Sequence, residues 1–217
     1  MLFPGEAATL VEPKMNSYDA LQTARTRSHI ERIERELTGN QPASKESLMN
    51  QKSAAVLVPL FERHGDLHAI FIRRSDHVAS HRGQVAFPGG RVDARDRDLL
   101  ATALREAHEE VNIEPGSVRV LGSMTVLSTL TSGITVAPFV GLLGDAAGLR
   151  PDPAEVAEIF AVPLSSLADP RYRAEYQLSR AARYPAIVYD GQTIWGLTLR
   201  ITDRLLEVSG ITPPASS

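Results

Sequence analysis

The chain has 217 residues, of which 43% are hydrophobic and 23% are charged, as in a soluble globular domain. Lysine and arginine number 23 against 26 aspartate and glutamate residues, so the net charge of −3 argues against a protein that binds nucleic acid through a basic surface. The absence of cysteine excludes disulfides, cysteine-based zinc sites and thiol nucleophiles. Any metal would therefore have oxygen or histidine ligands, which favours hard ions such as Mg²⁺ and Mn²⁺.

The sequence gives no sign of a membrane or secretory segment. No stretch of about 18 apolar residues is present, and the N-terminus lacks a basic region followed by an apolar one. We therefore expect a cytoplasmic protein with no membrane partner.

The first 50 residues are predicted to form an arm outside the main domain. Proline and glycine within residues 1–15 indicate a loose segment, and residues 40–51 resemble a polar linker. Between them, apolar residues at helical spacing from Ser17 to Leu37 predict a polar helix with a thin apolar stripe. Such a stripe favours packing on the main domain or on a second copy of the chain, so a homodimer is one possible arrangement.

The main domain is predicted to span residues 51–210, followed by a loose tail at 211–217. An apolar run at 54–61 predicts a buried strand that is joined by a turn to a hairpin partner at 67–72. Further strands are predicted at 84–87, 117–128, 133–143, 155–162, 186–189 and 193–195, and helices at 97–111, 163–167 and 196–208. This order favours an α/β sandwich, a mixed sheet flanked by helices.

The predicted helix at 97–111 carries three acidic residues on one turn. Glu106, Glu109 and Glu110 stand at positions i, i+3 and i+4, which share one helix face. Their mutual repulsion would be relieved by divalent cations. Because the opposite stripe is apolar, we expect the acidic face to point away from the core, into a cleft or solvent. Taken alone, the pattern also fits a merely solvated face.

A glycine pair precedes this helix, in the segment Phe87-Pro88-Gly89-Gly90-Arg91. Two glycines after a strand let the backbone turn sharply and expose a carbonyl, so the carbonyl of Gly90 is a candidate metal ligand. Arg105 is expected to pair with Glu109 one turn later and with Asp96 at the helix start. Those pairs would fix the directions of the carboxylates.

Together these residues resemble the Nudix box, G-x5-E-x7-R-E-U-x-E-E-x-G-U, in which U is a bulky aliphatic residue. The matching residues are Gly90, Arg105, Glu106, Glu109, Glu110 and Ile113. Asp96 stands in place of the first glutamate, Ala107 is smaller than usual, and Asn112 replaces a glycine. The spacing from the first glycine to the arginine is one residue longer than the general pattern. The resemblance implies a Nudix-type α/β/α sandwich.

Other segments resemble the coenzyme A pyrophosphatase branch of this family, in which the extra residue is usual. They are Arg74-Ser75, His81 to Gly90, Glu155 to Phe160 and Ile194 to Thr198. The resemblance runs from about Ala54 to Leu206 and departs at Ile72, where threonine is common. It implies hydrolysis of coenzyme A or acyl-coenzyme A to 3',5'-ADP and 4'-phosphopantetheine or its acyl form.

The resemblance also implies roles for the acidic residues. Glu106 and Glu110 would be the principal ligands of Mg²⁺ or Mn²⁺, with Glu109 as a ligand or an outer partner and the Gly90 carbonyl completing the site. A glutamate, either Glu109 or an outside residue such as Glu155, would accept the proton of the attacking water.

Four further residues are expected to contact the nucleotide substrate: Arg73, Arg74, Ser75 and His81. Arginine suits bidentate contacts with phosphate, although both arginines also fit ordinary strand-end charges. Trp195 and Phe160 are interpreted as core residues rather than base-stacking platforms. Two alternatives stay open: another Nudix specificity, such as ADP-ribose, NADH or a dinucleoside polyphosphate, and a catalytically silent nucleotide-binding domain.

Overall fold

The computed structural model describes residues 17–40, 53–78, 81–128, 133–179 and 182–212. The predicted arm at 1–15, nearly all of the predicted linker at 40–51 and most of the predicted tail at 211–217 lie outside these residues. The described part therefore comprises the predicted N-terminal helix and most of the predicted main domain.

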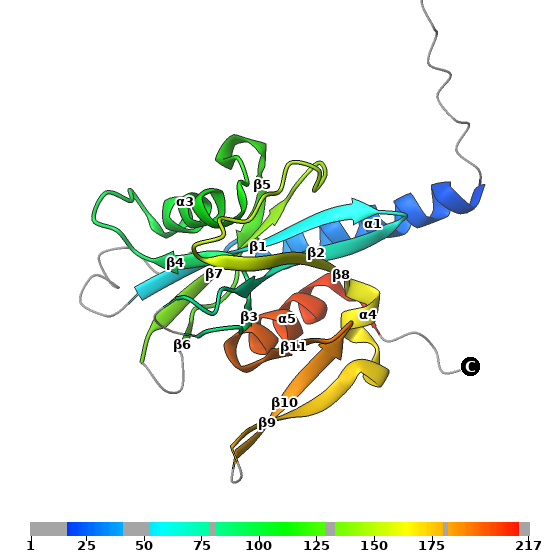
Figure 1. Ribbon diagram of the computed structural model, residues 1–217. Coiled ribbons are helices and arrows are strands. Elements are labelled where there is room, and N and C mark those ends of the chain that lie inside the picture. Colours follow the sequence, from blue (N-terminus) through cyan, green and yellow to red (C-terminus); the bar gives the residue numbers. More distant parts are fainter. Residues whose placement is uncertain (1–16, 41–52, 79–80, 129–132, 180–181, 213–217) are drawn as a thin grey trace, which may run out of the picture.

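An eight-stranded mixed sheet forms the centre of the molecule (Figure 1). Its strands are β1 (Ser53–Arg63), β2 (Asp66–Arg74), β3 (Val85–Ala86), β4 (Gly89–Arg91), β5 (Arg119–Ser123), β6 (Leu127–Ser128), β7 (Thr135–Leu142) and β8 (Val156–Pro163). The central path is β3-β2-β1-β7-β5, with β8 on β2, β4 on β1 and β6 on β7. Strands β1 and β7 are parallel, whereas the other pairs are antiparallel. The predicted mixed sheet is confirmed.

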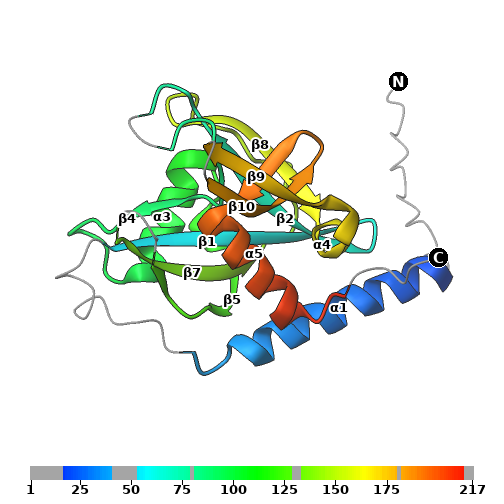
Figure 2. The same ribbon diagram turned by 90° about the horizontal axis from the view of Figure 1, so that it is seen from below.

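Helices cover both faces of this sheet (Figures 1 and 2). Helix α3 (Leu99–Val111) packs on one face, where its buried Ala103 and Ala107 join a core cluster with Leu57 of β1. The other face carries α1 (Ser17–Leu37), α4 (Leu164–Ala168) and α5 (Gly196–Ser209). The α/β/α arrangement is therefore confirmed. Among the described helices, none has both the length and the apolar character needed to cross a membrane.

Helix α1 packs on the domain of its own chain. Its Ile33 and Leu37 are fully buried in the core cluster that also contains residues of α5. The Thr26 hydroxyl donates a hydrogen bond of 2.9 Å to the carbonyl of Gly65 in the β1–β2 turn. The thin apolar stripe is thus buried against the sheet and α5, as one of the two expected arrangements requires.

A second sheet of three antiparallel strands extends below the first (Figure 1). It contains β9 (Arg173–Ser179), β10 (Ala182–Tyr189) and β11 (Gln192–Trp195). The last two were predicted, but β9 was not, because nearly all of its residues are exposed and it shows no apolar alternation. Strand β4 was also missed: the glycine segment was interpreted as a turn, yet it pairs with β1.

The predicted strand at 117–128 is interrupted in the structure. A 3-10 turn at Pro115–Ser117 precedes β5, and residues 124–126 separate β5 from β6. A further 3-10 turn, Pro170–Tyr172, leads into β9. Phe160 and Trp195 are both half-buried, with ring centroids 5.6 Å from Phe71 and 4.6 Å from Tyr176, respectively.

Candidate active site

The bounds of helix α3 are set by capping at both ends. Asp98 is the N-cap, and its carboxylate accepts a hydrogen bond of 2.7 Å from the backbone N–H of Ala101. Asn112 ends the helix in the left-handed conformation, with φ of 59°, and its N–H bonds to the carbonyls of the last turn. Asparagine therefore does here what glycine does in the Nudix pattern.

The three glutamates on α3 differ greatly in exposure. The side chain of Glu109 is 58% exposed, that of Glu106 is 17% exposed, and that of Glu110 is only 2% exposed. The expectation that the whole acidic face points into a cleft or solvent is therefore wrong for Glu110. The reason is β4, whose Gly89 N–H donates a hydrogen bond of 2.9 Å to Glu110 Oε2 and encloses that carboxylate.

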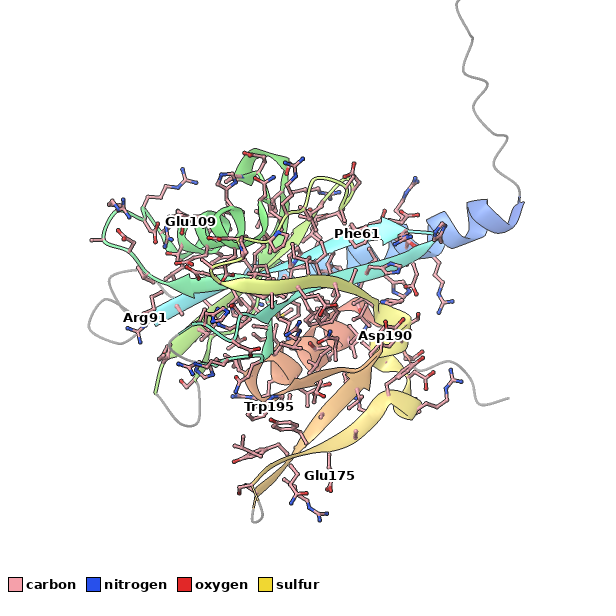
Figure 3. The ribbon with its side chains drawn as sticks, viewed as in Figure 1. Phe61, Arg91, Glu109, Glu175, Asp190 and Trp195 are labelled. Carbon is pink, nitrogen blue, oxygen red and sulfur yellow. The ribbon has the colours of Figure 1, made fainter. Side chains whose placement is uncertain are left out.

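The glycine pair allows α3 to approach β4 closely. A Cβ atom at Gly90 would lie 2.4 Å from the carboxyl carbon of Glu106, so only glycine leaves room for this carboxylate. The structure thus brings the backbone of Gly90 next to Glu106, as a shared metal site requires. Figure 3 shows Glu109 on α3 and Arg91 at the end of β4 on the same side of the molecule.

Arg105 holds several carboxylates in place. Its guanidinium donates to both oxygens of Asp96, at 2.9 and 3.0 Å, to Glu106 at 2.9 Å and to Glu109 at 3.0 Å. Both pairs expected for Arg105 are present. Asp96 is buried and also accepts a hydrogen bond of 2.8 Å from the Thr102 hydroxyl. The hydrogen bonds from Arg105 lower the pKa of Asp96 to about 2, so this carboxylate stays ionised.

The pKa of Asp96 is lowered, whereas that of Glu110 is raised. Burial raises its pKa to about 7, although the Gly89 N–H and the charge of Arg74 both lower it. Burial likewise raises the pKa of Glu106, and the negative charge of Glu155 raises the pKa of both residues. The helix carboxylates and Glu155 therefore interact electrostatically, and a bound cation would relieve their repulsion.

The two arginines at the end of β2 have different partners. A β-bulge between Arg73 and Arg74 interrupts the pairing of β2 with β8. Arg74 Nη1 lies 3.2 Å from Glu110 Oε1, whereas Arg73 Nε lies 3.2 Å from Glu158 Oε2. Gln192 of β11 donates to the same Glu158 oxygen at 2.9 Å. Of these two arginines, Arg74 is therefore the one that contacts a carboxylate of α3.

Ser75 and His81 lie on the chain segment that follows Arg74. Ser75 is buried, and its N–H donates a hydrogen bond of 2.8 Å to the backbone carbonyl of Glu155. His81 is exposed, and its ring nitrogen lies 2.9 Å from Gln84 Oε1. Ser75 thus fixes the position of Glu155, whereas His81 contacts its own loop.

Sequence reasoning missed three features of this site: the Arg74–Glu110 ion pair, the Gly89 N–H bond and the buried Thr102 hydroxyl. The ion pair and the Gly89 N–H bond join segments that are 36 and 21 residues apart, so no local pattern reveals them. Trp195 lies on the opposite side of the main sheet from Glu109 (Figure 3). Its ring is therefore not placed beside the acidic residues of α3.

The donor groups fit a hard divalent cation in their chemistry. Glu106, Glu109, Glu110 and the backbone at Gly90 supply only oxygen ligands, which Mg²⁺ and Mn²⁺ prefer. In the described ranges, however, no three acidic or histidine side chains already converge as a metal cage. Arg74 and Arg105 instead hold the carboxylates.

Comparisons with known proteins agree with this geometry. Residues 51–182 match the family described as the NUDIX domain. Two proteins described as "Uncharacterized Nudix hydrolase NudL" are similar: that of Photorhabdus laumondii is 42% identical, over 76% of this chain and 89% of that protein, and that of Pectobacterium atrosepticum is 41% identical, over 77% and 88%. A crystal structure of the Nudix hydrolase RenU from M. smegmatis shares the fold, with a TM-score of 0.51 and 17% identity, over 76% of this chain and 90% of that chain. The chain therefore belongs to the Nudix family.

Proposed function

We propose that this chain is a divalent-metal-dependent hydrolase that cleaves the pyrophosphate bond of coenzyme A or acyl-coenzyme A, releasing 3',5'-ADP and 4'-phosphopantetheine or its acyl form. Membership of the Nudix family supports the coarser part, the hydrolysis of a nucleoside diphosphate derivative with a divalent cation. The coenzyme A substrate is inferred from the segments outside the Nudix box.

One contact carries this inference: the ion pair of 3.2 Å between Arg74 and Glu110. Arg74 begins the segment that resembles the coenzyme A branch, and Glu110 belongs to the Nudix box. The backbone of Arg74 bonds to Gly83 and Gln84, at 3.1 and 3.0 Å, so the following loop is joined to the same site. Residues that are distant in the sequence thus surround one cluster of carboxylates, which supports a single substrate site.

Different side chains have different roles in the proposed reaction. Glu106, Glu110 and Glu109, with the Gly90 carbonyl, would hold the cation. When bound, Mg²⁺ or Mn²⁺ neutralises phosphate charge and lowers the pKa of the attacking water. Arg105 keeps the carboxylates of Glu106 and Glu109 in fixed directions.

In the reaction, the water oxygen bonds to one phosphorus, and the bond from that phosphorus to the bridging oxygen breaks. The electron pair of that bond leaves with the departing phosphate. The water proton passes to a carboxylate, either Glu109 or Glu155, both of which are exposed.

A product assay by mass spectrometry tests the proposal. Coenzyme A is incubated with the protein and Mg²⁺ or Mn²⁺ in ¹⁸O-labelled water. We expect 3',5'-ADP and 4'-phosphopantetheine, with the label in one of them, which identifies the phosphorus that is attacked. Chelation by EDTA should stop the reaction, and added metal should restore it.

A substrate panel under one metal condition separates the alternatives. A higher kcat/KM for ADP-ribose, NADH or a dinucleoside polyphosphate than for coenzyme A would overturn the coenzyme A assignment. Nucleotide binding with no cleavage at any metal concentration would overturn the hydrolase assignment and identify a silent binding domain.

A further inference from the structure

Both oxygens of Glu110 already have protein partners. Oε2 accepts a hydrogen bond of 2.9 Å from the Gly89 N–H, and Oε1 lies 3.2 Å from Arg74 Nη1. The carboxylate is 2% exposed, whereas the Arg74 side chain is 21% exposed. An ionised carboxylate at such depth requires a counter-charge, and Arg74 supplies it. The proposed metal ligand is thus neutralised by a guanidinium.

A guanidinium and a divalent cation cannot share one carboxylate oxygen without strong repulsion, since both are positively charged at the same contact distance. We propose that Arg74 is the resident counter-ion of Glu110 and leaves it when a divalent cation binds, which frees the guanidinium to bind a phosphate of the substrate. This inference rests on the proposed function and adds to it an exchange that couples metal binding to phosphate recognition.

The surroundings of Arg74 permit this exchange. Its backbone is fixed by hydrogen bonds to Gly83 and Gln84, so only the side chain needs to move. A released guanidinium offers two parallel N–H donors to phosphate oxygens. The neighbouring Arg73 differs, because Glu158 holds it away from the helix carboxylates. Arg173 of β9, whose guanidinium lies 2.7 Å from Asp203, has the same charge and an acidic partner outside this site, so it is the control.

The first test measures Mn²⁺ affinity by calorimetry at pH 8, with no substrate and no turnover. Arg74→Gln removes the competing charge, so Mn²⁺ should bind about tenfold more tightly than to the wild type. Arg74→Lys keeps a positive charge and should bind Mn²⁺ within about twofold of the wild type, as should the control Arg173→Gln. Unchanged or weaker Mn²⁺ binding by Arg74→Gln would overturn the exchange.

The second test measures ADP affinity with Mn²⁺ and in EDTA. With Mn²⁺, Arg74→Gln and Arg74→Lys should both bind ADP about tenfold more weakly than the wild type, because neither offers the paired donors. In EDTA the substitutions should have no effect, since the wild-type guanidinium is then held by Glu110. An equal loss of ADP affinity in both conditions would contradict the release of Arg74.

The lysine variant keeps the second test decisive if the glutamine variant does not fold, because lysine retains the counter-charge.

Different results would overturn the metal-dependent hydrolase and the exchange of Arg74. If the wild type binds no Mn²⁺, both the metal-dependent hydrolase and the exchange are wrong. If it binds Mn²⁺ and cleaves its substrate but Arg74→Gln binds Mn²⁺ no more tightly, only the exchange is wrong.

Discussion

Glu110 and Asp96 are buried carboxylates with opposite electrostatic environments. Asp96 is surrounded by donors from Arg105, Thr102 and the backbone N–H of Asp93, which hold its pKa near 2. Glu110 has one ion pair and one backbone donor, too few to offset burial, and its pKa rises to about 7. The hydrogen bonds of Asp96 thus outweigh the effect of its burial on the pKa, whereas at Glu110 burial outweighs the two partners.

Substitution of Glu110 tests its proposed role as a metal ligand. Glu110→Gln keeps the size of the side chain but removes its charge, so we expect at least a hundredfold loss of kcat, on the order found when charge-stabilising groups are removed. Folding should be intact, because an amide at this position removes a buried charge. The measurement is the coenzyme A product assay, with circular dichroism to check the fold.

The matched control is Glu114→Gln. Glu114 is 69% exposed and lies just beyond α3, where its Oε1 is 3.6 Å from Nδ1 of His108. Its loss should change kcat by less than about twofold, as for most surface substitutions. Wild-type turnover by Glu110→Gln would refute the assignment of this residue to the metal site.

The lowered pKa of Asp96 predicts that the stability of the folded protein depends on pH. Because its pKa falls from 3.8 to about 2 on folding, its ionised form stabilises the folded state above pH 3.8, and this contribution disappears as the pH falls through 2. We expect Asp96→Asn to lower the free energy of unfolding by about 1–2 kcal/mol at pH 7 and by progressively less below pH 4. Urea unfolding across this range measures the difference. A difference that does not depend on pH would show that Arg105 does not hold Asp96 ionised.

At the scale of elements, the contact between β4 and α3 depends on two glycines with different neighbours. A Cβ at Gly89 would lie 2.4 Å from the backbone oxygen of Ala55, whereas a Cβ at Gly90 would meet the end of the Glu106 side chain. A side chain can rotate away, but a paired strand backbone cannot. The two positions therefore predict different consequences for the same substitution.

We expect Gly89→Ala to lower the free energy of unfolding by about 2–3 kcal/mol, through strand displacement and the loss of the Glu110 hydrogen bond. Gly90→Ala should remain folded within about 1 kcal/mol but bind Mn²⁺ at least tenfold more weakly, because Glu106 must move. Urea unfolding and calorimetry measure the two effects. Equal destabilisation by both substitutions, with unchanged Mn²⁺ affinity, would contradict this account.

Sequence patterns predicted the elements whose residues show regular burial. Helix α3 was recognised from its apolar stripe and β1 from its continuous apolar run, since one face or both faces of these elements pack in the core. Strand β9 was missed because it is almost entirely exposed, and β4 because its glycines resemble a turn. Propensity could not reveal β4, since it is held by its pairing with β1.

At the scale of the whole molecule, the site combines segments from separate parts of the chain. The Nudix box identified Arg105 and the three glutamates of α3. It could not show that Arg74 reaches Glu110 or that Glu155 lies close enough to affect it, because both follow from the order of strands in the sheet. The burial of Glu110 was missed for the same reason. Patterns thus predicted the two pairs of Arg105 but neither the partner of Arg74 nor the burial of Glu110.

Helix α1 contributes to the core of the main domain, although the sequence suggested that residues 1–50 form an arm outside it. Leu37 is 1% exposed, and its Cβ would lie 2.5 Å from a Cβ placed on Gly122 of β5, so helix and strand are in close contact. We expect Leu37→Ala to lower the free energy of unfolding by about 2–4 kcal/mol, as for other buried leucines.

Arg35 on the same helix provides the control for this prediction. Its side chain is 68% exposed and forms a surface ion pair of 3.9 Å with Glu36, so Arg35→Ala should change the free energy of unfolding by less than about 0.5 kcal/mol. Urea unfolding of the full chain measures both variants in one transition. If α1 were a separable arm, Leu37→Ala would leave the main transition at the wild-type urea concentration. A shift of that transition by Leu37→Ala alone would instead establish that the helix is part of the cooperative unit that holds the site.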